Sequence, residues 1–390
     1  MSFFIKNFCI APFIQLQISK NGETGPCPYI ANVWNHKKYK TVKEKWNSTE
    51  LENLRSDFLL NKKNPICKRC WRDEDNGKKS LRQRLNNLSI KVSNDTREKN
   101  LQNKIFLKYI EKKDYKKYPK ILTLIPGNEC NLACVTCSSS FSSKWNSELK
   151  TIPNNNILVQ NKNYNMNEEE YQDVVDNSKY LQKIELFGGE PFFNKKNRKL
   201  LIEKIIEKGT SKNIILYFNT NGTFFDKEYL HYITKNFKKL EIRVSIDGIH
   251  EQFEYLRYGA KYHDVIENAK KFSALENSNF EVICTVSSYN FLYLDAYDAE
   301  FQKYNWSVFY NVVSGPDRIM LFNIPDKVKK DIKLSPKFKD IENCVNSQNY
   351  NVKAWEEFVD YTKLIDQNRK LNMGKIFPKF YQLVKKHGFE

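Results

Sequence analysis

The sequence lacks a long apolar run, a secretion signal and a sustained internal repeat. No run approaches the ~18 consecutive apolar residues that a membrane-spanning helix needs. The first nine residues carry no charged n-region, and Lys6, Asn7 and Pro12 interrupt any apolar h-region. We therefore expect a cytoplasmic protein that has no membrane partner.

Acidic residues are scarce relative to basic ones. The 390 residues include 46 Asp and Glu against 64 Lys and Arg, which gives a net charge of +18 and a pI of about 9.2. A basic balance alone is weak evidence for nucleic-acid binding, and the lysine runs at 112–113 and 327–330 are typical of solvated faces. A nucleic acid is therefore the less favoured partner. With 40% hydrophobic and 14% aromatic residues, the chain can bury a core in roughly two to three domains.

Nine cysteines are present, and in a reducing cytosol they favour metal binding over a disulfide framework. An apolar run ends at Gly127 and is followed by Cys130, Cys134 and Cys137, spaced C-x3-C-x2-C. Structural zinc needs four closed ligands, whereas a cubane iron–sulfur cluster offers one coordination position on each of four irons. Three cysteines would hold three irons and leave the fourth open to a substrate. The alternative is a zinc loop whose fourth ligand lies elsewhere.

Four further cysteines lie near the N-terminus. Cys67 and Cys70 form a C-x2-C pair, and Cys9 and Cys27 flank a hairpin predicted from the alternating run 13–18 and the turn at 21–22. From chemistry alone, the four residues predict either a structural zinc site or an iron–sulfur cluster. The remaining two, Cys284 and Cys344, are interpreted as a buried small hydrophobe and an incidental thiol.

The chain divides into four segments by its pattern. Residues 1–85 predict a small cysteine-rich α+β unit with a helix over 46–55 that Ser48 caps. Residues 86–118 read as a basic linker, and residues 319–390 as a helical segment that is interrupted at Phe377-Pro378. Between them, residues 119–318 alternate strand-like and helical runs, with a capping box at Asn167 and a surface loop at 150–165.

Six strands are expected in the segment 119–318. They lie at 121–126, 184–188, 214–219, 240–246, 280–287 and 306–313. Strands that alternate with helices favour a parallel sheet with right-handed crossovers, so the fold class is α/β, as a partial (β/α)6 barrel. Functional residues are then expected at the carboxyl ends of the strands.

Small polar residues follow several of these strands. Gly188, Gly189 and Glu190 stand at the end of the second strand, Asn219 ends the third, and Ser245 and Asp247 stand at the end of the fourth. Ordinary turn chemistry explains any one of these ends. Taken together after a three-cysteine loop, they predict a ligand site in which Glu190 accepts from an ammonium or hydroxyl group and the Asn and Asp residues bind ribose-like hydroxyls.

The combination of C-x3-C-x2-C, Gly-Gly-Glu-Pro and Ser-Ile-Asp-Gly resembles the radical S-adenosylmethionine (radical SAM) superfamily over about residues 120–315. The resemblance implies that Cys130, Cys134 and Cys137 hold a [4Fe–4S] cluster whose open iron binds S-adenosylmethionine. It implies that residues 188–190 bind the methionyl amino group, and that Asn219, Ser245 and Asp247 contact the ribose or the carboxylate. One position departs from the pattern, because Thr136 stands where the family often has an aromatic residue near the adenine.

The N-terminal cysteines resemble half of a SPASM domain, known as a twitch domain. The pattern C-x12-G-x4-C followed by C-x2-C carries this likeness, as does a group of surrounding residues: Pro12, Phe13, Trp46, Asn47, Ser48, Arg55, Glu74, Gly77, Ser80 and Arg82. Such segments usually follow the barrel, whereas this one precedes it. The resemblance implies an auxiliary iron–sulfur cluster, of the [4Fe–4S] or [2Fe–2S] type, held by Cys9, Cys27, Cys67 and Cys70.

These features together predict an enzyme that forms a 5′-deoxyadenosyl radical and abstracts a hydrogen from a substrate. The resemblance favours a peptide or protein substrate, and a small metabolite or nucleotide is the alternative. A flavodoxin- or ferredoxin-type protein, or a reductase, is the expected electron donor. The competing hypothesis is a non-enzymatic zinc- or cluster-bearing nucleic-acid-binding protein, which leaves Gly-Gly-Glu-Pro unexplained.

Overall fold

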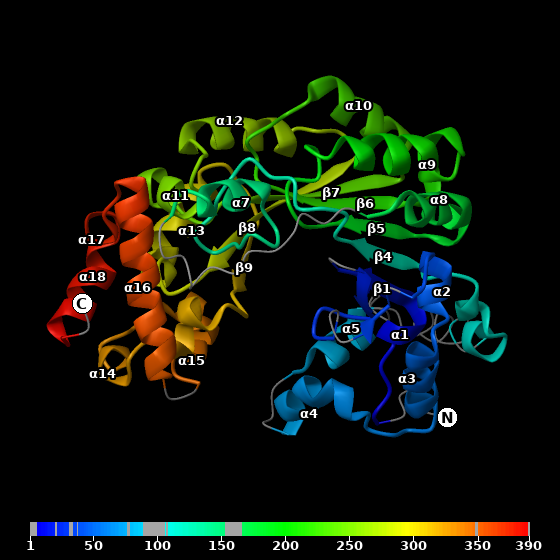
Figure 1. Ribbon diagram of the computed structural model, residues 1–390, viewed down its shortest axis with the longest axis horizontal. Helices are drawn as coiled ribbons and strands as arrows, with labels where there is room; N and C mark the ends of the chain where they lie inside the picture. The colour runs from blue at the N-terminus through cyan, green and yellow to red at the C-terminus, as the bar shows by residue number, and fades with distance from the viewer. Residues whose placement is uncertain are drawn as a thin grey trace.

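A nine-stranded sheet forms the centre of the computed structural model, with strand order β3-β2-β1-β4-β5-β6-β7-β8-β9 (Figure 1). The structure describes residues 6–19, 22–30, 34–36, 38–75, 79–88, 106, 108–152, 166–347 and 350–388. Most of the loop expected at 150–165 and most of the linker expected at 86–118 lie outside these residues. Within them, no helix is long and apolar enough to cross a membrane.

The six strands expected in the segment 119–318 are all present and parallel. They are β4 (Ile121–Leu124), β5 (Lys183–Leu186), β6 (Ile215–Thr220), β7 (Lys239–Ser245), β8 (Ser278–Val286) and β9 (Val308–Val312). Each pairs with the next along the chain, which confirms the α/β class and the partial barrel. In β7, Leu240, Ile242 and Val244 are buried and alternate with partly exposed residues, as expected of a strand with one face under helices.

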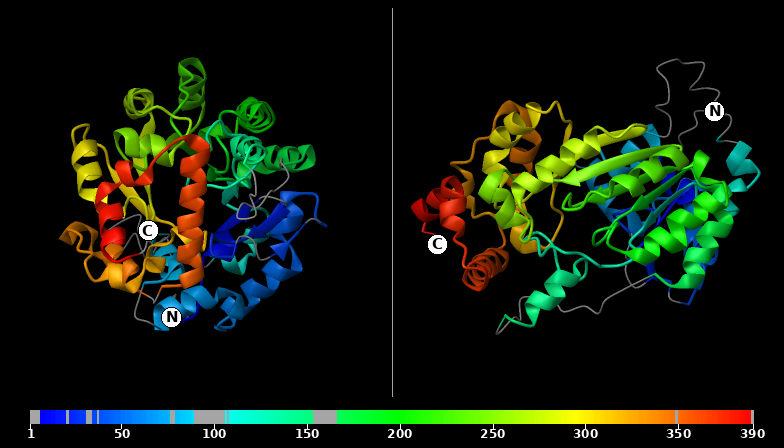
Figure 2. Two further views of the ribbon diagram at one scale, coloured as in Figure 1. Left: turned by 60° about the vertical axis from the view of Figure 1, so that its left-hand side comes forward. Right: turned by 90° about the horizontal axis from the view of Figure 1, so that it is seen from above.

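Helices connect these strands, and most of them cover the outer face of the sheet (Figure 2). They are α7 (Ser143–Leu149), α8 (Glu168–Asn177), a π-helical turn at Asn197–Glu203 that continues as α9 (Lys204–Glu207), α10 (Lys227–Asn236), α11 (His250–Leu256), α12 (Tyr262–Ser273) and α13 (Leu294–Gln302). The capping box predicted at Asn167 is confirmed, because its side chain accepts from Glu170 N and the Glu170 carboxylate accepts from Asn167 N.

The face of the sheet opposite these helices is charged rather than apolar. Lys183 of β5 pairs with Glu185 at 3.1 Å and with Glu241 of β7 at 2.7 Å. Arg243 of β7 pairs with Glu281 of β8 at 2.5 Å. These side chains are partly exposed, so the inner face of this partial barrel is a polar surface.

The N-terminal strands extend the same sheet. β1 (Gln15–Ile18) and β2 (Glu23–Gly25) pair antiparallel, which confirms the predicted hairpin, although Asn21 of its turn lies outside the described residues. β3 (Trp34–Asn35) continues the antiparallel pairing. β1 also pairs parallel with β4, in register from Gln15↔Ile121 to Ile18↔Leu124. The cysteine-rich segment is therefore joined to the barrel by main-chain hydrogen bonds, a pairing that the sequence pattern did not indicate.

Five helices surround this hairpin. They are α1 (Ala11–Ile14), α2 (Val42–Trp46), α3 (Thr49–Leu59), α4 (Lys68–Asp75) and α5 (Leu81–Leu88). Ser48 caps α3 as predicted, accepting from Leu51 N, but Trp46 ends the preceding helix instead of starting this one. The Arg55 guanidinium stacks on the rings of Trp46 and Tyr115 and donates to Pro12 O at 2.8 Å. Several residues of the twitch-like pattern thus pack as one structural unit.

The C-terminal segment is helical, as predicted. It contains α14 (Asp326–Lys329), α15 (Lys339–Val345), α16 (Val352–Arg369), α17 (Met373–Ile376) and α18 (Pro378–Lys386), with the expected interruption at Phe377-Pro378. α16 is the longest of them and lies at the side of the barrel away from the N-terminal elements (Figure 1). Its Thr362 Oγ1 lies 2.7 Å from Tyr289 Oη, in the loop after β8, so the segment packs directly against the barrel.

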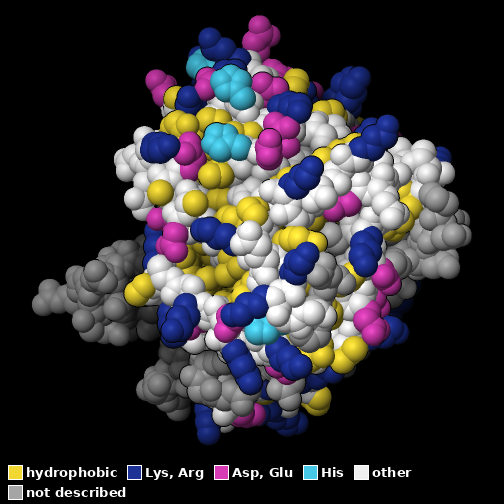
Figure 3. All heavy atoms as spheres, turned by 90° about the vertical axis from the view of Figure 1, so that its left-hand side faces the viewer, with side chains coloured by type: hydrophobic (Ala, Val, Ile, Leu, Met, Phe, Trp, Pro, Cys, Tyr) yellow, Lys and Arg dark blue, Asp and Glu magenta, His cyan; other side chains and the backbone are white. Residues whose placement is uncertain are grey.

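Basic side chains do not form a continuous stripe on the face shown in Figure 3. Lys and Arg are spread over it with Asp and Glu among them. Many lysines also have carboxylate partners, for example Lys270 with Glu267 at 2.6 Å and Lys386 with Asp331 at 2.6 Å. Of the basic runs interpreted as solvated faces, 112–113 is exposed, as are both ends of 327–330, but Lys329 is buried and pairs with Asp326 at 2.7 Å.

Candidate functional site

A cavity of about 710 Å³ opens where the parallel strands end. Its wall brings together residues from the cysteine loop, from the ends of β5 to β8 and from the segment after β9. The lining includes Cys130, Cys134, Thr136, Cys137, Phe141, Trp145, Phe187, Gly188, Gly189, Asn219, Asn221, Ser245, Arg257, Thr285 and Arg318. The position agrees with the rule that parallel α/β folds bind ligands at the carboxyl ends of their strands.

The three cysteines of the loop face this cavity together. Asn221 Nδ2 lies 3.8 Å from Cys130 Sγ, and Arg257 Nη1 lies 3.9 Å from Cys134 Sγ. Among the described residues, no three His, Cys, Asp or Glu side chains converge on a single metal ion. A cubane cluster spreads its cysteine ligands over separate irons, so its ligands need not meet at one point.

Burial changes the acid–base chemistry of these thiols. It raises the pKa of Cys130 to about 11 and of Cys137 to about 12, and the negative charge of the neighbouring cysteines raises both further. Burial also raises the pKa of Cys134. Deprotonation of these three thiols is therefore disfavoured unless a positively charged group binds the thiolates. The iron of a cluster supplies such a charge. In this respect the donor set fits a cluster.

Two glycines allow the loop after β5 to lie against the cysteine loop. Gly188 and Gly189 have φ values of +79° and +58°, which L side chains rarely adopt. A Cβ on Gly189 would lie 2.4 Å from the carbonyl oxygen of Glu129, the residue before the first cysteine. Backbone bonds close the contact, from Glu190 N to Glu129 O at 2.7 Å and from Gly189 N to Phe141 O at 3.1 Å.

We expect Gly189→Ala to displace the cysteine loop. The left-handed backbone costs about 1–2 kcal/mol for a non-glycine residue, and the clash with Glu129 O adds to it. The expected result is a melting temperature lowered by several degrees and a lower iron content after reconstitution. Gly209→Ala is the matched control, because Gly209 has a φ of +75° but nothing within 4 Å of its Cβ position. Equal iron loading in the two variants would contradict the close approach.

Glu190 occupies a different place from the one expected. Its carboxylate is almost completely buried and accepts from Thr220 Oγ1 at 2.9 Å and from Asn221 N at 2.7 Å. Burial raises its pKa to about 7. The side chain thus ties β5 to the end of β6, and Glu190 is not among the residues that line the cavity. Its contact with a methionyl amino group stays a prediction, which would use a lone pair beyond these two hydrogen bonds.

Of the three remaining predicted site residues, Asn219, Ser245 and Asp247, only the first two reach the cavity. Asn219 and Ser245 line the cavity, and Asn219 Oδ1 accepts from Tyr217 Oη at 2.7 Å. Asp247 does not line it. Its fully buried carboxylate accepts from Thr285 N at 2.7 Å and pairs with Arg257 Nε at 2.9 Å. Asp247 therefore orients Arg257 toward the cysteines.

Arg257 is the functional candidate that sequence reasoning missed. It follows α11 directly, lines the cavity and carries a positive charge next to Cys134. No motif marks it in the sequence, and only the spatial partner Asp247 identifies it. Thr136 also lines the cavity, where the aromatic side chains Phe141, Trp145 and Phe187 supply ring surfaces that this position lacks.

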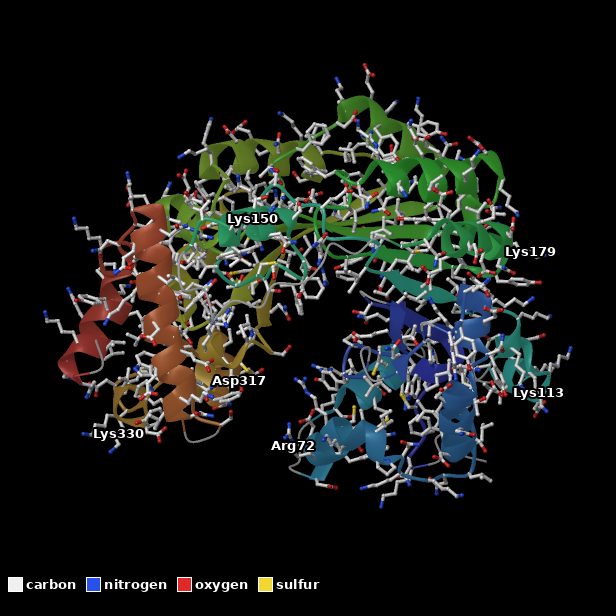
Figure 4. All side chains as sticks on the ribbon, in the orientation of Figure 1. Arg72, Lys113, Lys150, Lys179, Asp317 and Lys330 are labelled. Carbon is white, nitrogen blue, oxygen red and sulfur yellow. The ribbon has the colours of Figure 1, made fainter. Side chains whose placement is uncertain are left out.

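The four N-terminal cysteines also come together. Burial raises the pKa of Cys27 to about 11 and of Cys67 to about 12, and it raises the pKa values of Cys9 and Cys70 as well. The charges of other cysteines of this group raise the pKa of Cys9, Cys27 and Cys67 further, so these thiols lie near one another. This second donor set is separate from the cavity, because none of its members lines it. In Figure 4, Arg72, on α4 of this unit, and Asp317, after β9, lie on the sides of the two parts that face each other.

A mostly buried ion pair between Glu74 and Arg82 stabilises the site of the four N-terminal cysteines. The Glu74 carboxylate accepts from Ser80 Oγ at 2.6 Å and from Arg82 Nε and Nη2 at 3.0 and 2.6 Å. Arg82 Nη1 donates to Phe8 O, next to Cys9, at 2.5 Å, and its guanidinium stacks on the ring of Trp71. The pattern Glu74, Ser80 and Arg82 therefore joins the segment of Cys9 to the helix of Cys70.

We expect Arg82→Ala to lower stability by about 3 kcal/mol, because it leaves a mostly buried carboxylate unpaired. The amount of iron bound at the N-terminal site after reconstitution should also be lower in this variant. Lys63→Ala removes the exposed pair with Asp75 and should cost less than about 1 kcal/mol. Denaturant unfolding of the metal-free proteins compares the two variants, and similar losses would argue against a fastening role for Arg82.

Comparison with known proteins agrees with this arrangement. The radical SAM superfamily matches residues 124–294, and the iron–sulfur cluster-binding SPASM domain matches residues 9–71. No curated protein matches the chain. Among solved structures, anSMEcpe with bound AdoMet is 19% identical, over 65% of this chain and 63% of that one, with a TM-score of 0.40. Streptococcus suis SuiB bound to S-adenosylmethionine is 15% identical, over 83% and 67%, with a TM-score of 0.37.

A third similar structure is anSMEcpe with bound AdoMet and Kp18Cys peptide, at 20% identity over 59% of this chain and 62% of that one, with a TM-score of 0.40. The chain thus spans less than two thirds of the length of anSMEcpe. The superfamily match implies a [4Fe–4S] cluster and S-adenosylmethionine as cofactors, and the SPASM match implies an auxiliary iron–sulfur cluster. The matches identify residues 124–294 as a radical SAM domain, and the segment that matches an iron–sulfur cluster-binding domain precedes it in the chain.

Proposed function

We propose that the protein is an enzyme that cleaves S-adenosylmethionine reductively and modifies a peptide or protein substrate. The observation that carries the proposal is the shared cavity, in which Cys130, Cys134 and Cys137 meet the glycine turn 188–189 and the polar ends of three further strands. When bound, the [4Fe–4S] cluster and S-adenosylmethionine supply a 5′-deoxyadenosyl radical, which abstracts a hydrogen atom from the substrate.

The residues of the chain bind and orient these groups. The three thiolates would hold three irons, and Arg257, fixed by Asp247, places a positive charge beside Cys134. The Asn219 and Ser245 side chains offer hydrogen bonds to the ribose or the carboxylate of S-adenosylmethionine. Phe141 and Phe187 are the aromatic surfaces that we assign to the adenine in place of Thr136, and they also exclude water from the cavity.

Cys9, Cys27, Cys67 and Cys70 would ligate the auxiliary cluster fully. Four thiolates leave no open iron, so this cluster would conduct electrons or stabilise the fold and would not bind a second S-adenosylmethionine. We propose that a flavodoxin- or ferredoxin-type protein, or a reductase, delivers the electrons. The presence of a SPASM segment supports a peptide or protein as the substrate class. A small metabolite or nucleotide is the alternative.

Anaerobic reconstitution followed by reduction with dithionite tests this proposal. The wild-type protein should carry close to two clusters and form 5′-deoxyadenosine from S-adenosylmethionine. Mass spectrometry of candidate peptides should then show a change of hydrogen count or a new bond that depends on S-adenosylmethionine. Full cluster loading without any cleavage would end the proposal, and zinc in place of iron and sulfide would favour the nucleic-acid-binding alternative.

A further inference from the structure

The cysteine loop is held from one edge by the last residue of α11 and the segment after it. Ala133 N donates to Tyr258 O at 3.0 Å, and Val135 N donates to Leu256 O at 2.8 Å. Both donors lie between the first and the third cysteine. The amide edge of the loop is therefore fixed by residues within the part of the chain that the superfamily matches.

The carbonyl edge of the same loop is held by side chains. Arg369 Nη2 donates to the carbonyl of residue 133 at 2.8 Å, Trp145 Nε1 to that of residue 134 at 2.8 Å, and Tyr361 Oη to that of residue 135 at 2.9 Å. Three consecutive carbonyls thus each accept a buried hydrogen bond. Two of the three donors, Tyr361 and Arg369, belong to α16, which lies outside both matched regions.

Both α16 donors are themselves rigidly placed. Arg369 is 7% exposed, forms two hydrogen bonds of 2.7 and 3.0 Å with the Glu148 carboxylate and stacks over Trp145 and Tyr258. Tyr361 is fully buried, and the guanidinium of Arg318, a residue of the cavity wall, stacks on its ring at 4.2 Å. Neither side chain can move without breaking several buried contacts.

We propose that Tyr361 and Arg369 are positioning residues that set the geometry of the loop that binds the first cluster. This inference rests on the proposed function of that loop. The carbonyls of residues 133–135 belong to the peptide units on either side of the Cys134 Cα and the one after it, so anchoring them fixes the backbone from which the Cys134 side chain projects. Partners outside the first ligand shell orient metal ligands and tune the potential of a cluster. Helix α16 would thus add two donors to an edge of the loop that Trp145 alone would otherwise hold.

Hydrogen exchange of the metal-free protein tests the anchoring without any cofactor. We expect Tyr361→Phe and Arg369→Gln to speed exchange of the Ala133 and Val135 amides by about tenfold, because each leaves a buried carbonyl unpaired. Tyr289→Phe is the matched control, because it removes a buried hydroxyl that pairs with Thr362 of the same helix and does not touch the loop. Unchanged exchange in both variants, or an equal effect of the control, would overturn the proposal.

The reconstituted protein gives a second readout. Tyr361→Phe should shift the midpoint potential and the electron paramagnetic resonance line shape of the reduced first cluster while the melting temperature stays near that of Tyr289→Phe. Arg369→Lys should not restore the wild-type spectrum, because a lysine cannot reproduce the forked contact with Ala133 O and Glu148. If Arg369→Gln does not fold, Tyr361→Phe alone tests the positioning role. A wild-type spectrum and potential in that variant would refute the positioning role, whether or not the wild-type protein cleaves S-adenosylmethionine.

Discussion

Cys130→Ala is expected to lose S-adenosylmethionine cleavage by more than about 100-fold. Removing a partner outside the ligand shell of a metal already costs 10–100-fold in affinity or activity, and removing a ligand should cost more. Anaerobic reconstitution should leave only the iron of the N-terminal site, and 5′-deoxyadenosine should fall to background. Quantification of iron, sulfide and 5′-deoxyadenosine in the same samples measures both effects.

Cys344→Ala is the matched control for this prediction. Cys344 lies on α15 and belongs neither to the cavity nor to the N-terminal cysteines, so its removal should leave iron content and cleavage unchanged. Retention of cleavage in Cys130→Ala would show that another group holds the cluster. Loss of cleavage in Cys344→Ala would show that the assay reports general damage to the protein.

Cys67→Ala should separate the two sites. We expect it to keep about four irons per chain, all at the first site, and to form 5′-deoxyadenosine without substrate within a few-fold of the wild-type rate. Conversion of the substrate should be lost, because the N-terminal site without its cluster can neither pass electrons nor hold the segment in place. The comparison of uncoupled cleavage with substrate turnover measures this separation.

The same variant can also contradict the account. Complete loss of iron from Cys67→Ala would mean that the cysteine-rich segment and the barrel fold as one unit, which the pairing of β1 with β4 makes a concrete alternative. Full substrate turnover would mean that the N-terminal thiols serve no step of the reaction. Circular dichroism and the melting temperature of the metal-free variant distinguish misfolding from the loss of a single cluster.

Local pattern was sufficient to predict the barrel. The six runs that became β4 to β9 are short, apolar and bounded by turn residues, and each strand overlaps its expected range. The cysteine spacing and the polar strand ends then predicted where the cavity would form. Parallel strands end on one edge, so residues far apart in sequence, such as Cys130 and Ser245, had to meet there.

Local sequence pattern did not predict the long-range strand pairing or the burial of individual side chains. The parallel contact of β1 with β4 joins segments about one hundred residues apart, and no local signal encodes it. The ligand contacts of Glu190 and Asp247 stay predictions, but the sequence pattern did not indicate that their buried carboxylates bind Thr220, Asn221 and Arg257. Arg257 itself became a candidate only once its position next to Cys134 was known.

The central claim is that the three-cysteine loop carries a cluster with one iron open to S-adenosylmethionine. Electron paramagnetic resonance of reduced Cys67→Ala, in which only that cluster remains, tests the claim most directly. The account predicts that adding S-adenosylmethionine changes the signal of this cluster. In the Cys130→Ala protein, no signal that responds to S-adenosylmethionine is expected. A full-intensity signal that S-adenosylmethionine leaves unchanged would contradict it.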